Sequence, residues 1–182
     1  MASVAAQIPY ILGSAGVMTL VFFTAPPDAA EQYGLVAKSP DHLVGILGMH
    51  VLHGNLAHLT GNLSDFVPLM VLLSASHQRP WMVAAILAVL SGALLWTFGR
   101  PWTGVHIGAS GLVAALVGYL VTRGLVMASA AAVLVAVAVF FLYGISTLAG
   151  ISPSLEDAGI SWEGHLAGVV AGVAVGAVDR SL

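Results

Sequence analysis

One stretch of the sequence, residues 107–122, reads IGASGLVAALVGYLVT and carries no charged side chain. It is apolar enough for a membrane helix, although it is shorter than the usual span of about 20 residues. Ser110, Ala114 and Gly118 are spaced four residues apart, so they share one face of a helix. Small residues at that spacing let a second helix come close to the backbone. The stretch therefore predicts a short membrane helix that packs tightly against another.

The composition of the whole chain agrees with a membrane location. The protein has 182 residues, of which 59% are hydrophobic and 7% are charged, whereas a soluble domain carries roughly 25% charged residues. This excludes soluble globular and disordered proteins, and the net charge of −3 leaves no basic surface for nucleic acid. The chain has no cysteine, which excludes disulfides and thiolate metal sites. We therefore expect an integral membrane protein embedded in the lipid bilayer.

Polar loops divide the chain into six apolar segments. No basic residue precedes the first segment, so we expect a retained helix there rather than a signal peptide. The second segment is unusual because it contains His50, His53, His58, Asn62 and Asp65. We expect a single domain over residues 1–182, without a soluble domain, and membrane spans at approximately residues 8–23, 48–75, 80–98, 107–122, 128–148 and 162–178.

The basic residues between these segments indicate the orientation of the chain. With the N-terminus inside, the cytoplasmic connections contain Arg79, Arg123 and Arg180, and the outer connections contain Lys38 and Arg100. An excess of basic residues marks the cytoplasmic side of a membrane protein. We therefore expect both termini to be cytoplasmic.

Polar residues gather at one level of this arrangement. The second, fourth and sixth segments run in the same direction, from the outer side inward, so their first turns lie at one depth. Polar groups within a bilayer are costly, and they usually face the bundle interior or a water-filled cavity. The turns in question contain His53, His58, Asn62, Ser110 and His165. We expect these side chains to surround one cavity that opens to the extracytoplasmic side.

A serine and a histidine in these turns are candidates for nucleophilic catalysis. His165, Gly168, Gly172 and Gly176 lie along one face of the sixth segment, and the glycines allow close helix packing. If that face meets the small-residue face of the fourth segment, Ser110 lies near His165. A hydroxyl beside an imidazole has the geometry of an activated nucleophile. The same pattern is also typical of two helices that simply pack together.

Two further polar residues are candidates for an oxyanion hole. His58 and Asn62 are four residues apart, so they face the same way on a helix and both carry hydrogen-bond donors. The backbone N–H of Ser110 lies in a first helical turn, where amides lack an intrahelical partner. Donors that converge on one point stabilise a developing oxyanion. The alternative is that His58 and Asn62 bond to each other or to neighbouring helices.

Two other chemistries compete with this interpretation. A zinc protease would need histidines four residues apart with a glutamate between them, and no such motif is present, so we expect no metal. Asp65 is a carboxylate within the second span, and such groups often belong to proton pathways. A small proton-coupled transporter is therefore an alternative function, although one acid without an inverted repeat supports it weakly.

Three motifs lie on the three segments that share a direction. Residues 108–111 read GASG and are followed by ALVGY at 115–119, residues 53–62 read HGNLAHLTGN, and residues 161–168 read SWEGHLAG. Together with the glycine repeat and Asp179, they resemble the rhomboid family of intramembrane serine proteases, in its minimal bacterial form. The resemblance covers essentially the whole chain. It implies an all-α membrane protein, a six-transmembrane-helix rhomboid-like bundle, in the plasma (inner) membrane of a prokaryote.

The resemblance also implies roles for single residues. Ser110 would be the nucleophile, and His165 would be the general base and then the acid, in a dyad without a carboxylate. His58, Asn62 and the Ser110 amide would form the oxyanion hole, and Gly108 would let the loop bend into it. The other matches are His53, Gly111, Gly168 and Gly172 as supporting residues, and Phe140, Phe141 and Trp162 as a gate at the lateral entry of the substrate.

The substrates implied by the resemblance are single-span transmembrane proteins, cut near their outer end and usually after a small residue. No cofactor takes part. Because a helical peptide bond is shielded, the scissile segment must become extended before attack. Residues 149–161 would form a cap loop over the cavity. We therefore predict a serine-type endopeptidase that acts within the membrane.

Three positions depart from the family pattern. Ala114 stands where an aromatic residue usually stacks on the catalytic histidine, and Asp65 stands where an apolar residue is usual. The first outer loop also lacks the Trp-Arg pair of many members. None of these changes removes a catalytic group. The missing aromatic residue nevertheless keeps open an alternative, a catalytically weak or inactive rhomboid-like protein that binds membrane clients.

Overall fold

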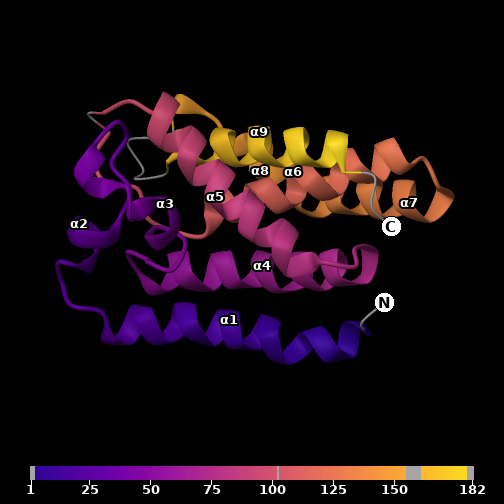
Figure 1. The fold of residues 1–182 in the computed structure, drawn as a ribbon, viewed down its shortest axis with the longest axis horizontal. Helices are drawn as coiled ribbons and strands as arrows, with labels where there is room; N and C mark the ends of the chain where they lie inside the picture. Colours follow the sequence, from indigo (N-terminus) through magenta and orange to yellow (C-terminus); the bar gives the residue numbers. More distant parts are fainter. Residues whose placement is uncertain (1–2, 102, 155–160, 180–182) are drawn as a thin grey trace.

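The structure, a computed structural model, describes residues 3–101, 103–154 and 161–179. The described residues form helices joined by loops, without a β-sheet (Figure 1). The elements in chain order are α1 (Val4–Thr24), α2 (Ala29–Tyr33), the 3₁₀-helix η1 (Pro40–His42), α3 (Gly45–Gly48), α4 (Leu56–Ser76), α5 (Pro80–Phe98), α6 (Ser110–Met127), α7 (Ala130–Val139), the π-helical turn η2 (Phe140–Gly144), α8 (Ile145–Ala149) and α9 (Trp162–Val178).

Six helical segments account for the membrane domain. Five are long and apolar enough to cross a bilayer: α1, α4, α5, α6 and the continuous segment Ala130–Ala149, which joins α7, η2 and α8. The sixth, α9, is apolar but shorter. The all-α six-helix membrane bundle predicted from the sequence is therefore confirmed. The start of α1 and the end of α9 lie at the same end of the bundle, as an even number of spans requires (Figure 1).

The second span differs from its predicted bounds. It begins at Leu56 rather than near residue 48, because Asn55 caps the helix by accepting a hydrogen bond from the His58 amide (2.8 Å). His50 and His53 therefore lie in the preceding loop and not in the span. Hydrophobicity alone did not reveal this boundary, since the residues before the cap are as apolar as those after it.

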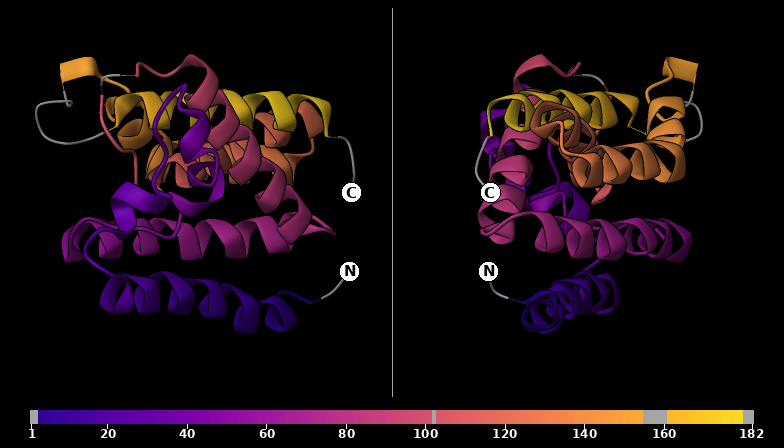
Figure 2. Two further views of the ribbon diagram at one scale, coloured as in Figure 1. Left: turned by 60° about the vertical axis from the view of Figure 1, so that its left-hand side comes forward. Right: turned by 90° about the vertical axis from the view of Figure 1, so that its right-hand side faces the viewer.

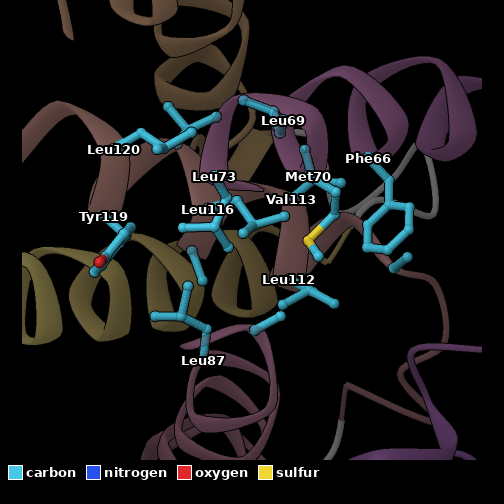
Figure 3. Close-up of a cluster of buried hydrophobic side chains, with 14 of the residues drawn as sticks. Phe66, Leu69, Met70, Leu73, Leu87, Leu112, Val113, Leu116, Tyr119 and Leu120 are labelled. Carbon is cyan, nitrogen blue, oxygen red and sulfur yellow. The ribbon is translucent and has the colours of Figure 1, made fainter. Parts of the chain in front are cut away.

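Helix α6 lies at the centre of the bundle. In the apolar stretch of α6, 67% of the residues are buried inside the protein, compared with 11% in that of α1. In Figure 1, α9 lies along one side of α6 and α4 along another, while α1 is outermost and packs on α4; Figure 2 shows the same separation of α1 from the rest. A close-up of the core shows leucine, methionine and phenylalanine side chains of α4 against those of α6 (Figure 3).

The contact between α6 and α9 is a backbone contact. A Cβ atom added at Gly168 would collide with the Gly111 carbonyl oxygen, and one at Gly172 would collide with the Ala115 carbonyl oxygen. The small-residue faces predicted from their four-residue spacing therefore meet. Because both helices begin at the same end of the bundle, this contact also aligns their first turns.

A polar cluster closes the opposite end of the bundle. The Tyr119 hydroxyl donates a hydrogen bond to Asp179 (2.6 Å), and His77 Nε2 lies 3.1 Å from the same carboxylate. The Arg79 amide donates to His77 Nδ1 (2.9 Å), so that nitrogen carries no proton and the ring is neutral, with its proton on Nε2. Burial lowers the pKa of His77, although the nearby Asp179 carboxylate partly opposes this effect. The cluster thus joins the C-terminal ends of α4 and α9 to the middle of α6.

We expect this histidine to make the stability of the protein depend on pH. Because the folded pKa is lower than the unfolded one, protonation favours unfolding, so the stability is fully present above about pH 6.5 and falls below it. Thermal unfolding in detergent measures this effect between pH 7 and pH 5. His77→Gln keeps a donor toward Asp179 but cannot titrate, so its midpoint should fall less over that range. An equal fall in both proteins would contradict the assignment.

Candidate active site

A cavity of about 680 Å³ lies at the end of the bundle where α4, α6 and α9 begin. It brings together four of the side chains predicted to carry chemistry: Ser110, His165, His58 and Asn62. They come from three helices that are far apart in the sequence. The rest of its wall is formed by Gly54, Asn55, Ala57, Gly61, Val105, His106, Ile107 and Ser161.

Ser110 is the first residue of α6 and follows a sharply bent loop. Gly108 has a φ of +114°, a conformation that side chains rarely adopt. A Cβ there would collide with His58 Nε2 and lie 3.4 Å from Asn62 Nδ2. The backbone before the serine therefore passes directly against these two side chains, and only glycine fits.

Asn62 offers a free donor beside this loop. Its side chain is 7% exposed, and its Nδ2 atom has no hydrogen-bond partner among the described residues. An unsatisfied buried donor costs free energy, typically about 1–3 kcal/mol. Such a donor suits a site that receives an oxyanion during a reaction.

His165 is oriented by a backbone carbonyl. Its Nδ1 atom lies 3.0 Å from the Gly150 oxygen, and because a carbonyl can only accept, Nδ1 carries the proton. Nε2 is then the basic nitrogen of the neutral ring. A Cβ at Gly150 would lie 2.5 Å from His165 Nδ1, so this contact also requires glycine. Gly150 was not predicted as a site residue.

Ser110 and His165 lie on adjacent first turns. A Cβ at Gly111 would be 3.2 Å from the Gly164 carbonyl oxygen, which places the two backbones side by side. Between the described residues, no hydrogen bond joins the Ser110 hydroxyl to His165 in this structure. Catalytic hydrogen bonds are often long without substrate and tighten in the complex. The arrangement is thus that of a pair on one cavity wall, not of a formed dyad.

A second histidine connects the nucleophile loop to α9. His106 Nδ1 lies 2.7 Å from the Ser161 hydroxyl, which caps α9 by accepting from the Gly164 amide (3.1 Å). His106 is also held through its backbone, which exchanges two hydrogen bonds with Leu35 (2.8 and 3.0 Å). The ring is therefore fixed between the loop before Ser110 and the first turn of the helix that carries His165. No motif in the sequence indicated this role for His106.

A charged pair also connects the loop before Ser110 to α9. Arg100 Nε lies 2.6 Å from Glu163 Oε1, and the Arg100 guanidinium lies 5.3 Å from the centre of the Trp162 ring. Trp162 faces an apolar groove between α5 and α9 rather than the catalytic cavity. Phe140 and Phe141, in the π-helical turn, also lie outside the cavity lining. The structure therefore does not gather the three predicted gate residues at the site.

His53 supports the loop from behind. Its Nε2 atom accepts a long hydrogen bond from the Ala109 amide (3.5 Å), and its ring packs edge-on against His58 with centres 5.1 Å apart. Burial, and secondarily the neighbouring His58, lowers the pKa of His53 to about 4. The ring is thus neutral at physiological pH and can act as an acceptor.

The other predicted elements of the site are placed as follows. Among the described residues, no three histidine or acidic side chains gather as metal ligands would. The cap loop predicted over residues 149–161 lies partly outside the described residues, since 155–160 are not described. Ala114 is buried against α9 at Gly168, and a Cβ at that glycine would lie 3.0 Å from the Ala114 Cβ.

Comparison with known proteins identifies relatives of the chain. It is similar to uncharacterised proteins of Mycobacterium tuberculosis and Mycobacterium bovis, each 34% identical over 150 residues, which are 77% of this chain and 60% of the relative. An uncharacterised protein of Mycobacterium leprae is 33% identical over 153 residues, or 79% of this chain and 59% of the relative. The chain thus spans about three fifths of the length of these relatives.

A sequence family described as the Rhomboid domain matches residues 40–181. The match includes α4, α6 and α9, which form the cavity, and the loops that support it. The helical bundle and its membrane-spanning segments agree with that family. The chain is therefore a multi-pass bacterial membrane protein, and it belongs to the rhomboid family, whose members are generally intramembrane serine proteases.

Proposed function

We propose that the protein is an intramembrane serine endopeptidase that cleaves transmembrane helices near their extracytoplasmic end. The observation that carries this proposal is the shared cavity, in which Ser110 and His165 face the donors of His58 and Asn62. The tautomer of His165, with its Nδ1 proton held by the Gly150 carbonyl, leaves Nε2 available as a base. Family membership favours a protease over a proton-coupled transporter.

The reaction would be an acyl transfer through a serine ester. The Ser110 oxygen attacks the scissile carbonyl carbon while His165 Nε2 takes the hydroxyl proton. The Asn62 side chain, the Ser110 amide and the His58 ring donate hydrogen bonds to the resulting oxyanion. His165 then gives its proton to the leaving amine, and the C–N bond breaks.

Water completes the cycle. His165 removes a proton from a water molecule, which attacks the ester carbon, and the second oxyanion occupies the same donors. Breakage of the ester bond returns the proton to Ser110 and releases the new carboxyl end of the substrate. The polar cavity at the ends of α4, α6 and α9 would supply this water.

The substrate and the location follow from the same proposal. The substrates would be single-span membrane proteins that enter from the lipid and become extended at the cleaved bond, past Phe140 and Phe141. The protein would lie in the plasma membrane of a prokaryote, with cytoplasmic termini and an extracytoplasmic active site.

A second candidate is a rhomboid-like protein that binds membrane clients without cleaving them. It is favoured by the missing hydrogen bond between Ser110 and His165 and by Ala114 in place of an aromatic side chain. Both candidates use the same fold, so activity must decide between them.

We expect a fluorescent fluorophosphonate to label the wild-type protein in detergent or liposomes. The reagent reacts with serines that a base has activated. Ser110→Ala and His165→Ala should lose labelling by at least about 100-fold, the usual scale for a lost catalytic group. Each variant is checked for folding by its thermal midpoint. No labelling of folded wild type supports the client-binding candidate, and labelling of Ser110→Ala means that another serine is the nucleophile.

Replacing Gly150 tests the orientation of His165. A Cβ at this position would displace the ring that donates to the Gly150 carbonyl. We expect Gly150→Ala to lower kcat for a transmembrane substrate by about tenfold or more while the protein stays folded, because catalysis is sensitive to small misplacements. Gly13→Ala is the matched control, since a Cβ at Gly13 meets nothing within 4 Å. Equal rates for the two variants would contradict the role of Gly150.

Replacing His106 tests the connection between the nucleophile loop and α9. We expect His106→Ala to lower kcat about tenfold with little change in KM, because the loop and the cap of α9 lose their common partner while the other residues that line the cavity remain. His106→Gln keeps a donor and an acceptor and should recover part of kcat. The matched control is His42→Ala, since His42 lies outside the cavity and contacts the Gly34 carbonyl. A change in KM alone would argue against a positioning role.

A further inference from the structure

A carboxylate within a membrane-spanning helix has no basic partner among the described residues. Asp65 lies in α4 and is half-buried, and its recorded contact is a weak hydrogen bond from the Ser64 hydroxyl (3.4 Å). Carboxylates in this position are costly and normally pair with another group or face a wet cavity. The mechanism proposed above does not use this side chain. Among the described residues, the side chain of Asp65 is therefore available to a partner from outside the chain.

The position of Asp65 on α4 connects it to the catalytic cavity. Seven residues separate it from His58, which on an α-helix is two turns, about 10 Å, along nearly the same face. Gly61, between them, lines the cavity together with Ala57 and His58. The wall of the cavity on α4 therefore continues toward Asp65.

This side of α4 is not covered by a neighbouring helix at the level of the cavity. Gly61 and Ala57 are exposed, and a Cβ at Gly61 would meet nothing within 4 Å. The helices that pack on α4 are α1, α5 and α6, whereas α7 packs on α6. A transmembrane segment that reaches Ser110 along this open side would pass Asp65.

We propose that Asp65 recognises the transmembrane segment of the substrate by accepting a hydrogen bond from a donor side chain, above all a lysine. The inference rests on the proposed function and specifies its substrate class. The negative charge of Asp65 complements a cationic donor, and lipid tails at this depth offer no donor at all. The donor would lie about seven residues from the cleaved bond, in the part of the segment that stays helical.

Designed transmembrane peptides test this inference. Their binding reports on Asp65, and their cleavage reports on the proposed protease activity. The probes are apolar 21-residue transmembrane peptides with an alanine cluster near one end and a single lysine at one of five depths, or leucine in its place. Energy transfer in proteoliposomes measures binding to Ser110→Ala, which cannot cleave. We expect one lysine depth to bind about tenfold more tightly than the leucine peptide, the scale of a good hydrogen bond within a membrane.

Variants at position 65 test whether Asp65 causes the preference for lysine. In the Ser110→Ala background, Asp65→Leu should abolish the lysine preference, and Asp65→Asn, which keeps an acceptor oxygen without the charge, should retain part of it. The control is Asp41→Asn, which removes an acid from the loop outside the spans. Asp65→Asn also provides the test if Asp65→Leu does not fold.

The outcomes separate this inference from the proposed function. A lysine preference that persists in the folded Asp65 variants, or that is absent in the parent protein, overturns the role of Asp65. Cleavage of the leucine peptide by the Ser110 protein then still supports the protease. Lysine-dependent binding through Asp65 without cleavage of any peptide instead keeps the recognition role and supports the client-binding candidate.

Discussion

The close contact between α6 and α9 is the constraint on which the site depends. Gly168 and Gly172 bring the α9 backbone against the carbonyl oxygens of α6, and any side chain at these positions would force the helices apart. The contact fixes the relative height of the two helices as well as their distance. Ser110 and His165 belong to the first turns of these helices, so a pattern of glycines deep in the membrane sets the separation of two polar side chains at its edge. Lipid provides little hydrophobic drive for association between helices, and dispersion between closely packed backbones takes its place.

Helix packing alone does not orient the side chains of Ser110 and His165. Contacts from the loops provide this orientation. The His165 ring is held by a carbonyl from the end of α8, and the loop before Ser110 is tied to the cap of α9 through His106. Both contacts use groups that also end or begin a helix. The same residues therefore satisfy backbone polar groups and hold the His165 ring and the loop before Ser110 in place. The ring is held in this way although position 114 is an alanine and not an aromatic residue. Loops that are positioned by a rigid scaffold commonly carry such roles.

Much of the fold was predictable from the sequence, because membrane spans are long apolar runs and helix contacts use small residues at a fixed spacing. The bounds of α9 agree with those expected, and the small faces of α6 and α9 meet. The start of α4 was not predictable from hydrophobicity, since the Asn55 cap interrupts a run that stays apolar on both sides. The common direction of three spans placed Ser110 at the same membrane depth as the other candidate residues. The roles of Gly150 and His106 depend on long-range contacts that no local pattern encodes. The contact between Arg100 and the Trp162 ring is likewise a long-range contact that the sequence around Trp162 does not encode.

Asp65 differs from the polar groups at the two ends of the bundle. At the far end, Asp179 accepts a hydrogen bond from Tyr119 and lies 3.9 Å from Arg123 Nε, so its charge is balanced inside the protein. At the cavity end, Asn62 lines the cavity, and its Nδ2 atom has no hydrogen-bond partner among the described residues. Asp65 has no basic partner among the described residues, and it lies on the open side of α4 below the cavity. A donor on a transmembrane substrate would supply such a partner, and it would give the protein a means of choosing among helices that present similar apolar surfaces.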